Sequence, residues 1–583
     1  MIDPIDRETE TELIKRIDPN ELEAHVDAFT GLERVSGTAD EWRASEYVVD
    51  TLEKYGVGSE IFEYEGYISV PESGSVETTT PESRKLDSVI TTAFSASTPP
   101  TGVHGDVVRV AELDGLDEGT RRVRDAIVFT QGLPTPDIVR HAETLGAKAL
   151  VLESPTEGHL HEMIVSPVWG TPATDDVDEL PDLPVVEVSQ RDGRWLREQL
   201  DHGPVEATVT TDVTTRLETL PCPVGWIDGA ESDRYFVVGN HVDSWYEGVT
   251  DNATAMAATL ELARLFADQE PARGLVFGFW SAHSTGRYAG SSWYADTNWL
   301  DLRENGVAYL HIDLNGLQGA DGLWYQHMAE LGDEHLDAME TSTDFSIRTG
   351  DESWLGDADR PARNSDQSFW GTGLSSLLSG ARLEPGTEEG GPIGGGWWWH
   401  TPEDTRDKVD LDVLTEETKL YVALASRICE SPILPHDFTA TVDDFHDVLD
   451  EIEEETTTRF IDARDRLDEL RQSIAAANEI AEADAATDSD IAVAMEDLQV
   501  ILGTELIPTL YMETVEYDHE PAMSHRRLPY LRVAETVKES QGCERRFAET
   551  SLQRGRNKLN HRLERAQAAV NEFLTAHTSS HER

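Results

Sequence analysis

The feature that most constrains the fold is an alternation of strongly apolar strands with helices over about residues 213–435. Apolar runs at 235–238, 274–280 and 307–312 are each followed by polar residues. Runs of this length are typical of strands buried on both faces, and their alternation with helices is typical of a mostly parallel sheet. We therefore predict an α/β fold with a mostly parallel, mixed sheet that helices cover on both faces.

Polar side chains with metal-binding chemistry follow these strands. In open α/β sheets, ligands bind at the carboxyl ends of the strands, so residues far apart in the sequence converge there. Imidazole nitrogens and carboxylate oxygens form a ligand set suited to zinc or another divalent ion. The candidates are His241, Asp243, His283 and Asp313 after the three runs, His400 after an apolar run at 397–399, and Asp251 at the start of a helix.

Each candidate has another explanation when it is taken alone. Asp251 suits the N-terminal cap of a helix, His400 suits a capping or hydrogen-bonded buried histidine, and Asp313 suits a turn. Their common placement after strands strengthens the metal-site hypothesis. The glycine- and tryptophan-rich stretch 390–399 also has two possible interpretations. It fits either a pocket wall or a buried strand preceded by a loop.

The composition changes on both sides of the strand-rich region. The stretch 71–101 is rich in Ser, Thr, Pro and Glu, as at a domain boundary, and a strand–helix–strand pattern follows over 126–152. We predict that 76–212 form a separate domain inserted between 1–75 and the strand-rich region 213–435.

Beyond residue 435, apolar residues recur at helical spacing. The two seams consist of Phe460, Ala463, Leu467, Leu470 and Ile474, and of Leu559, Leu563, Ala566, Val570 and Phe573. Seams of this kind predict the buried core of a helical bundle rather than a cofactor site. We therefore predict a helical domain over 436–583.

The net charge excludes two classes of partner. The 583 residues include 113 Asp or Glu and 47 Lys or Arg, which gives a formal net charge of -66. Binding to phosphates or anionic lipids needs a basic face, so we expect neither a nucleic-acid nor a membrane partner. Concentrated salt screens such self-repulsion, which indicates a halophilic, high-salt cytoplasm. The few scattered cysteines and the absence of a signal-peptide pattern agree with a cytoplasmic protein.

Several motifs, taken in order, resemble those of metallopeptidase family 28. They are HVDSW at 241–245 followed by Asp251 and Asn252, WSAHSTG at 280–286, AYLHIDLNG at 308–316, SDQSFWGTG at 365–373 and HTPEDT at 400–405. That family contains zinc aminopeptidases, glutamate carboxypeptidase II and the non-enzymatic transferrin receptor. The resemblance covers nearly the whole chain, since 76–212 is similar to a protease-associated insert and 436–583 to a helical dimerisation domain.

The resemblance implies a zinc-peptidase-like fold and roles for individual residues. His241 and Asp313 match ligands of one metal ion, and His400 matches a ligand of a second. Asp251 matches the carboxylate that bridges both ions, and Asp243 the carboxylate that orients the first histidine. The implied activity is hydrolysis of an amide bond in a peptide or a small N-acyl or amino-acid-like substrate, with one or two zinc ions. A homodimer through the helical domain is implied as well.

The chain departs from the family at residues 283 and 284. Active members carry two consecutive glutamates there, a general base and a ligand of the second metal, whereas this chain has His283 and Ser284. The remaining ligands predict that one metal binds firmly and the second weakly or not at all. His283 is a candidate for the base, since an imidazole titrates near neutral pH, or for an additional ligand. The alternative function is that of an inactive binding or structural homologue similar to the transferrin receptor.

Five further residues are candidates for contacts with a substrate. Arg287 and Tyr288 fit either such contacts or ordinary packing on a helix. Arg360, Arg363 and Arg382 fit either a clamp on a substrate carboxylate or exposed surface positions.

Overall fold

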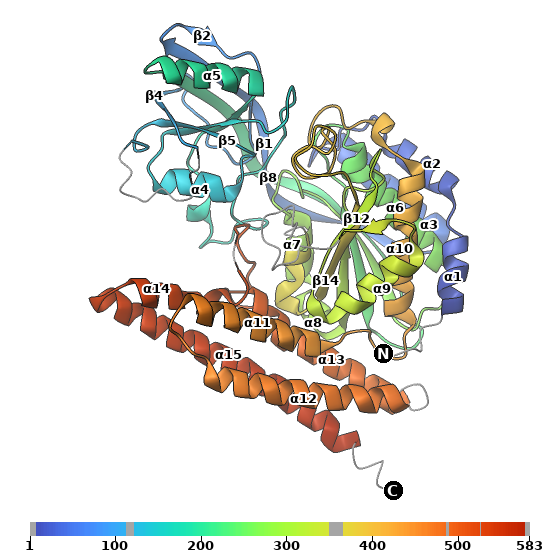
Figure 1. The fold of residues 1–583 in the computed structure, drawn as a ribbon. Helices are drawn as coiled ribbons and strands as arrows, with labels where there is room; N and C mark the ends of the chain where they lie inside the picture. Colours follow the sequence, from blue (N-terminus) through green and yellow to red (C-terminus); the bar gives the residue numbers. More distant parts are fainter. Residues whose placement is uncertain are drawn as a thin grey trace.

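Figure 1 shows the computed structural model, which describes residues 7–111, 113, 122–348, 365–484, 489–524 and 526–577. A large α/β body carries a smaller lobe on one side, and a layer of long helices lies against another side of the body. The α/β fold class predicted from the sequence is confirmed.

The sheet of the large body has parallel strands at its centre. Strands β10 (Gly274–Trp280), β9 (Tyr235–His241), β11 (Gly306–His311) and β14 (Ser375–Arg382) lie side by side and run parallel. On one side of these four strands, β8 (Glu206–Ile227) pairs antiparallel with β10. On the other side, β12 (Gly322–His327) pairs antiparallel with β14, and the short β13 (Ser346–Ile347) pairs with β12 at the edge of the sheet. The prediction of a mostly parallel, mixed sheet is therefore confirmed.

Helices bury both faces of this sheet, as strand β9 illustrates. Phe236 and Val238 belong to a core shared with α6 (Thr254–Phe266) and α10 (Leu411–Glu430). Val237 belongs to the opposite core, with residues of α7 (Ala289–Thr297) and α8 (Trp299–Asn305). Successive strand residues point to opposite faces, so burial on both sides explains the continuous apolar runs. Helices α1 (Arg7–Lys15), α2 (Pro19–Phe29), α3 (Ala39–Tyr55) and α9 (Gly332–Ser342) complete the body.

A long antiparallel ribbon joins the large body to the smaller lobe. Strand β1 (Gly58–Thr80) pairs along its length with β8, and in Figure 1 the two strands run from one part into the other. Both strands pass through the predicted boundaries near 75 and 212 without a break. The division into three domains stays a prediction, but the large body and the smaller lobe share this continuous pair of strands.

The smaller lobe has its own parallel strands. Strands β4 (Val103–Arg109), β5 (Ile127–Gln131), β6 (Ala149–Glu153) and β7 (Val185–Val188) are adjacent and parallel. The lobe also contains β2 (Arg84–Lys85), β3 (Val89–Thr91), α4 (Pro136–Thr144) and α5 (Gln190–His202). Succession of β5, α4 and β6 confirms the predicted strand–helix–strand unit.

The C-terminal part is helical, as its apolar periodicity predicts. Its helices are α11 (Phe438–Glu455), α12 (Ile461–Asp484), α13 (Ser489–Tyr511), α14 (Val533–Glu539) and α15 (Gly542–His577). Every residue of the two predicted seams is buried in one common core. In the described part of the chain, no helix combines the length and the apolar character needed to cross a membrane.

A buried arginine ties three helices of the large body together. Arg427 of α10 is fully buried, and its Nε lies 2.8 Å from Oε2 of Glu10 in α1. Its Nη1 lies 2.8 Å from Glu334 and 2.7 Å from Asp337, both in α9. This arginine neutralises carboxylates that would otherwise be desolvated without a counter-charge.

We expect Arg427→Ala to lower the free energy of unfolding by about 3–5 kcal/mol, because it leaves the buried Glu10 with a longer contact, 3.7 Å, to the partly exposed Arg7 in place of its contacts with Arg427. Denaturant unfolding in concentrated salt measures this change. The control is Arg471→Ala, whose exposed pair with Asp443 contributes no more than about 1 kcal/mol. Equal effects of the two substitutions would contradict the prediction.

Candidate metal centre

The predicted residues lie at one edge of the sheet because parallel strands end there. His241 is the last residue of β9, and Asp313 comes two residues after the end of β11. His283 follows β10, and Asp251 lies in the irregular turn Val249–Ala253 that leads into α6. His400 comes from the loop between β14 and α10.

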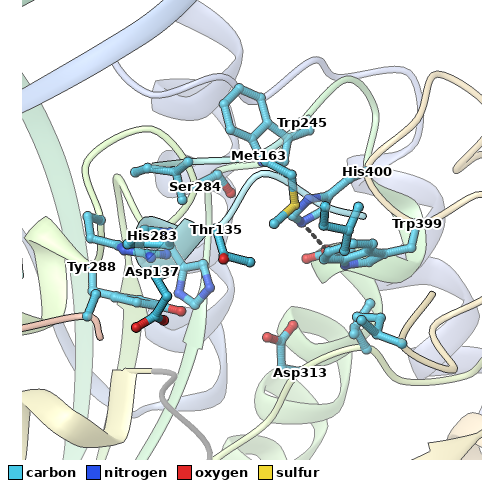
Figure 2. Close-up of a pocket in the computed structure, with 18 of the residues that line it drawn as sticks. Thr135, Asp137, Met163, Trp245, His283, Ser284, Tyr288, Asp313, Trp399 and His400 are labelled. Carbon is cyan, nitrogen blue, oxygen red and sulfur yellow. Dashed lines mark ion pairs between the residues drawn. The ribbon is translucent and has the colours of Figure 1, made fainter. Parts of the chain in front are cut away.

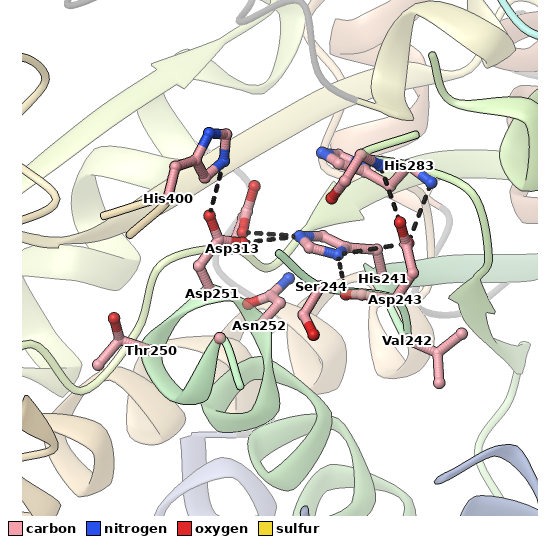
Figure 3. Close-up of polar contacts among 12 residues, drawn as sticks. His241, Val242, Asp243, Ser244, Thr250, Asp251, Asn252, His283, Asp313 and His400 are labelled. Carbon is pink, nitrogen blue, oxygen red and sulfur yellow. Dashed lines mark hydrogen bonds and ion pairs between the residues drawn. The ribbon is translucent and has the colours of Figure 1, made fainter. Parts of the chain in front are cut away.

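The carboxylate of Asp251 lies between two histidines, as Figure 3 shows. Its Oδ1 is 3.0 Å from Nε2 of His241, and its Oδ2 is 3.1 Å from Nε2 of His400. Oδ1 of Asp313 is 3.5 Å from the same nitrogen of His241. The structure thus brings the four predicted ligands together, with Asp251 between the two imidazoles.

The electrostatics of this cluster favour positive charge. Burial alone would lower the pKa of His241, but its contacts with Asp243, Asp251 and Asp313 raise that pKa well above the ordinary value. Burial and the charge of Asp313 would raise the pKa of Asp251, but its contacts with His241 and His400 hold that pKa below the ordinary value. The carboxylates are therefore ionised and stabilise a cation beside them.

Two buried atoms of the cluster, Nε2 of His241 and Oδ1 of Asp313, make ion-pair contacts but no hydrogen bond of good geometry among the described residues. His241, His283 and Asp313 each offer a ligand atom, and these atoms lie within 4.8 Å of one another. Buried polar atoms without a hydrogen bond of good geometry are costly unless an ion or water satisfies them. The nitrogen and oxygen donors at this position therefore fit a zinc ion or a similar divalent metal.

His283 lies in a stack of aromatic rings beside the cluster. Its ring is parallel to that of His241, with centroids 4.0 Å apart and 10° between the planes. The ring of Tyr288 meets it edge-on at 4.4 Å, and Oγ of Ser365 is 3.4 Å from its Nδ1. Burial, together with the charge of His241, lowers the pKa of His283 well below the ordinary value. The imidazole is therefore neutral at neutral pH, and its surroundings disfavour the protonated form.

Asp243 connects the end of β9 with the turn after β10. Its carboxylate accepts hydrogen bonds from the backbone N–H groups of His283, at 3.0 Å, and Ser284, at 2.9 Å. Nδ1 of His241 lies 2.9 Å from the backbone oxygen of Asp243 and 3.6 Å from its Oδ1. The closest oxygen that orients the His241 ring is thus a backbone oxygen, while the carboxylate mainly positions the 283–284 turn.

The smaller lobe holds the ring of His400. Nδ1 of His400 is 2.5 Å from the backbone oxygen of Glu162, and the backbone N–H of Glu162 donates to the backbone oxygen of His400. The ring of Trp399 stacks on that of His400 at 3.7 Å. A hydrogen bond at Nδ1 fixes the tautomer and leaves Nε2 facing Asp251.

The apolar run before His400 is not a strand, and the expectation that it ends a strand is wrong. Residues 397–400 form a turn. Gly394 and Gly396 have positive φ angles of 79° and 88°, which interrupt an extended backbone. Trp399 nevertheless lines a cavity, whereas Trp398 is buried and donates to Oγ1 of Thr250.

Three supporting residues were not among the predicted site residues. Oδ2 of Asp404 accepts the backbone N–H of Asp251 at 3.1 Å, and burial raises the pKa of Asp404 to about 7. Nε2 of His311 lies 3.4 Å from Oδ2 of Asp313. Asp404 and His311 lie within the motifs 400–405 and 308–316, so these motifs could have indicated them as site residues. Arg34 lies in no such motif.

Arg34 fixes the loop between His241 and Asp251. Its side chain is fully buried, and it donates to the backbone oxygens of Val242, Glu247 and Gly248 at 2.8–3.0 Å. Burial lowers the pKa of Arg34 to about 10, although nearby carboxylates such as Asp243 raise it. A buried guanidinium with several backbone acceptors holds an irregular loop in one conformation.

A cavity of about 430 Å³ opens beside the cluster (Figure 2). Its lining includes Asp251, His283, Ser284, Asp313 and His400. It also includes Arg287 and Tyr288, as the substrate-contact hypothesis expects.

Arg382 has a different role from the predicted carboxylate clamp. It is buried and donates to the backbone oxygens of Asp313 and Leu314. It therefore supports the loop that carries a predicted metal ligand. Arg360 and Arg363 lie outside the described residues.

Fold and site together define an α/β protein with a candidate metal centre at the carboxyl ends of its parallel strands. The model of peptidase family M28 matches residues 224–425, a range that contains all six predicted site residues. The match makes residues 224–425 of the chain similar to this peptidase family.

Curated relatives match only part of their length. The chain is 33% identical to the aminopeptidase NAALADL1 of Mus musculus over 126 residues, which cover 20% of this chain and 17% of that protein. It is 23% identical to the probable glutamate carboxypeptidase AMP1 of Arabidopsis thaliana over 357 residues, half of each chain. The chain thus spans half or less of these relatives.

Solved structures agree on the fold. An aminopeptidase from Aneurinibacillus sp. strain AM-1 superposes with a TM-score of 0.55 at 22% identity, covering 72% of this chain and 96% of the other. The peptidase M28 precursor from Shewanella amazonensis SB2B gives 0.56 at 17% identity, covering 73% and 97%. These similarities extend the agreement beyond the residues matched by the family model.

Proposed function

We propose that this protein is a metal-dependent hydrolase that cleaves an amide bond in a peptide or a small N-acyl or amino-acid-like compound. The observation that carries the proposal is the convergence of His241, Asp251, Asp313 and His400 beside a cavity, with their nitrogen and oxygen atoms 3.0–3.5 Å apart. A bound zinc ion would polarise the scissile carbonyl and lower the pKa of a water molecule.

The residues divide into one strong and one weak half-site. His241, Asp251 and Asp313 would hold one ion, with two carboxylates to offset its charge. Only Asp251 and His400 remain for a second ion, because Ser284 offers a neutral hydroxyl. We therefore propose that one ion is retained firmly.

His283 would take the proton of the attacking water. Its ring lines the cavity beside the proposed metal ligands and replaces the family's glutamate base, although burial lowers its pKa and makes it a weaker base than a free imidazole. Its parallel stacking on His241 argues against a role as an additional ligand of the same ion. A metal ion lies close to the plane of a coordinating imidazole, so two stacked rings are poorly oriented for one ion although their nitrogens lie within 4.8 Å of each other.

Metal analysis and a hydrolysis panel test this function. Protein purified in concentrated salt without chelator should retain about one zinc ion per chain and hydrolyse some of a series of aminoacyl and N-acyl amides. Chelator should abolish the hydrolysis, and zinc should restore it. Two tightly held ions would contradict the one-metal proposal. Absence of both metal and turnover would favour the inactive, transferrin-receptor-like alternative.

We expect Ser284→Glu to raise the metal content toward two ions per chain. The new carboxylate would extend from a cavity-lining position near Asp251 and His400, whose two donors are too few to hold an ion firmly. Calorimetric titration with zinc measures the stoichiometry. Ser284→Ala, which adds no donor, is the matched control and should leave it unchanged.

We also propose that residues 436–583 mediate a homodimer. The support is their similarity to a helical dimerisation domain. Analytical ultracentrifugation of the full chain in concentrated salt tests this proposal, and a monomer at all concentrations would contradict it.

A further inference from the structure

Strand β11 carries polar side chains at alternate positions near its carboxyl end. Tyr309 and His311 belong to the strand, and Asp313 follows two residues later. Alternate residues of a strand point to the same face, which explains why these three side chains lie in a row. The hydroxyl of Tyr309 lies 3.1 Å from Nδ1 of His311, and Nε2 of His311 lies 3.4 Å from Oδ2 of Asp313. A proposed metal ligand is thus connected to a buried tyrosine by way of His311.

Ser365 extends this row to the ring of His283. It begins the short helical segment Ser365–Thr372 before β14, and its hydroxyl hydrogen-bonds to that of Tyr309. Its Oγ also lies 3.4 Å from Nδ1 of His283. Ser365, Tyr309 and His311 are fully buried, where hydrogen bonds are electrostatically stronger than in water. The side chains form one hydrogen-bond chain, which runs in the order His283, Ser365, Tyr309, His311 and Asp313.

Two groups fix the direction of the hydrogen bonds in this hydrogen-bond chain. The carboxylate of Asp313 can only accept, so a neutral His311 keeps its proton on Nε2 and accepts at Nδ1. The hydroxyl of Tyr309 must then donate to His311. Nε1 of Trp280, which can only donate, lies 3.0 Å from the same hydroxyl oxygen. The oxygen of Tyr309 is therefore an acceptor toward both Trp280 and Ser365.

The same direction continues to His283. Because the one proton of the Tyr309 hydroxyl is used on His311, the hydroxyl of Ser365 donates to Tyr309 and its oxygen is left to accept. Burial raises the pKa of Tyr309 well above the ordinary value, so the phenol keeps this proton. Nδ1 of His283 must then donate to Oγ of Ser365. A neutral imidazole has one N–H group, so the lone pair of His283 is on Nε2.

We infer that Ser365, Tyr309 and His311 are positioning residues that hold His283 as the tautomer with its proton on Nδ1 and its lone pair on Nε2. The inference rests on the proposed function, because it defines the form in which His283 would act as a base. The proton of the attacking water would bond to Nε2, while the proton on Nδ1 stays on the ring. The oxygen of Ser365 accepts from Nδ1 before and after this transfer, so it stabilises the imidazolium that forms.

Solid-state nitrogen NMR of full-length, zinc-loaded protein with isotope-labelled histidine tests the inference without requiring turnover. Protonated and unprotonated ring nitrogens differ in chemical shift, and carbon–nitrogen correlations within the ring distinguish Nδ1 from Nε2. The signals of His283 are those that His283→Ala lacks. We expect a single form with the proton on Nδ1. A dominant Nε2–H form, an equal mixture of the two forms or a doubly protonated ring would overturn the inference.

Two substitutions interrupt the hydrogen-bond chain at different points. Ser365→Ala removes the acceptor of the Nδ1 proton, and Tyr309→Phe removes the acceptor of the Ser365 proton. Each should convert the single form of His283 into a mixture of tautomers and lower kcat by about tenfold or more, with the zinc content unchanged. Unchanged His283 signals in both variants would overturn the inference.

Ser379→Ala is the matched control for these substitutions. Ser379 is also a buried serine that contacts a histidine, since its Oγ lies 3.1 Å from Nε2 of His335. This pair lies outside the hydrogen-bond chain, so the substitution should leave the His283 signals unchanged. A change of the His283 signals as large as that in Ser365→Ala would contradict the assignment of the effect to the hydrogen-bond chain.

Turnover separates this inference from the proposed function. If His283 has the expected tautomer and responds to both variants but no amide is hydrolysed, the hydrolase proposal is wrong and the positioning role stands. If amides are hydrolysed while His283 carries its proton on Nε2, the hydrolase proposal stands and the positioning role is wrong.

Discussion

Replacing Asp251 with asparagine is expected to abolish firm zinc binding and, with it, any amide hydrolysis. The substitution keeps the shape of the side chain but removes the charge that lies 3.0 Å from His241 and 3.1 Å from His400. Both half-sites use this carboxylate, so the loss affects either ion. Changes in groups that merely support metal ligands weaken metal binding by about 10–100-fold, and loss of a shared ligand should exceed that range.

Zinc titration and metal analysis after gel filtration measure this loss directly. Asp137→Asn is the matched control, since Asp137 also lines the cavity but hydrogen-bonds to Ser524 instead of the histidines. The control should retain its metal. Full zinc retention by Asp251→Asn would show that the ion binds elsewhere.

The convergence of the site was predictable because it follows from strand topology. His241 and Asp313 stand at or just after the ends of parallel strands, and such strands end at one edge of a sheet. The helical seams were predictable for a similar reason, since their spacing follows the helical repeat. In both cases a local periodicity fixes where a side chain points.

Contacts between distant loops were not predictable from such periodicity. The orientation of His400 depends on the backbone of Glu162, which belongs to another lobe. The conformation of the loop after His241 depends on the buried Arg34, which precedes it by about 200 residues. A backbone acceptor has no residue type of its own, so the sequence carries no signal for these pairings.

The apolar residues that line the cavity were not predictable from the sequence either. Trp169 and Ala522 have no sequence feature that indicates a site, and they line the cavity because three distant parts of the chain meet there. The stretch 390–399, which the sequence indicated as a possible pocket wall, contributes Ile393 and Trp399 to the lining. Its glycines redirect the backbone into a turn, which a strand-based interpretation cannot anticipate.

His283→Ala is expected to lower kcat by about a hundredfold or more while zinc content stays near the wild-type value. His283 is the neutral imidazole that lines the cavity beside the proposed ion, and removal of a general base slows the proton transfer rather than the binding of metal. Substrate binding should change less than kcat, because the other residues that line the cavity remain. Steady-state kinetics on the best amide of the panel, together with metal analysis, measure both quantities.

A carboxylate at the same position separates a base from a structural role. His283→Glu supplies a proton acceptor without the stacked ring, so it should recover part of the activity lost in His283→Ala if proton transfer is the function of this residue. If stacking on His241 is what matters, glutamate and alanine should be equally impaired, and both should lose zinc. Ser284→Ala controls for changes in the turn that Asp243 holds. A kcat of His283→Ala within about twofold of wild type would contradict the base role, because that loss is far below the usual contribution of a general base.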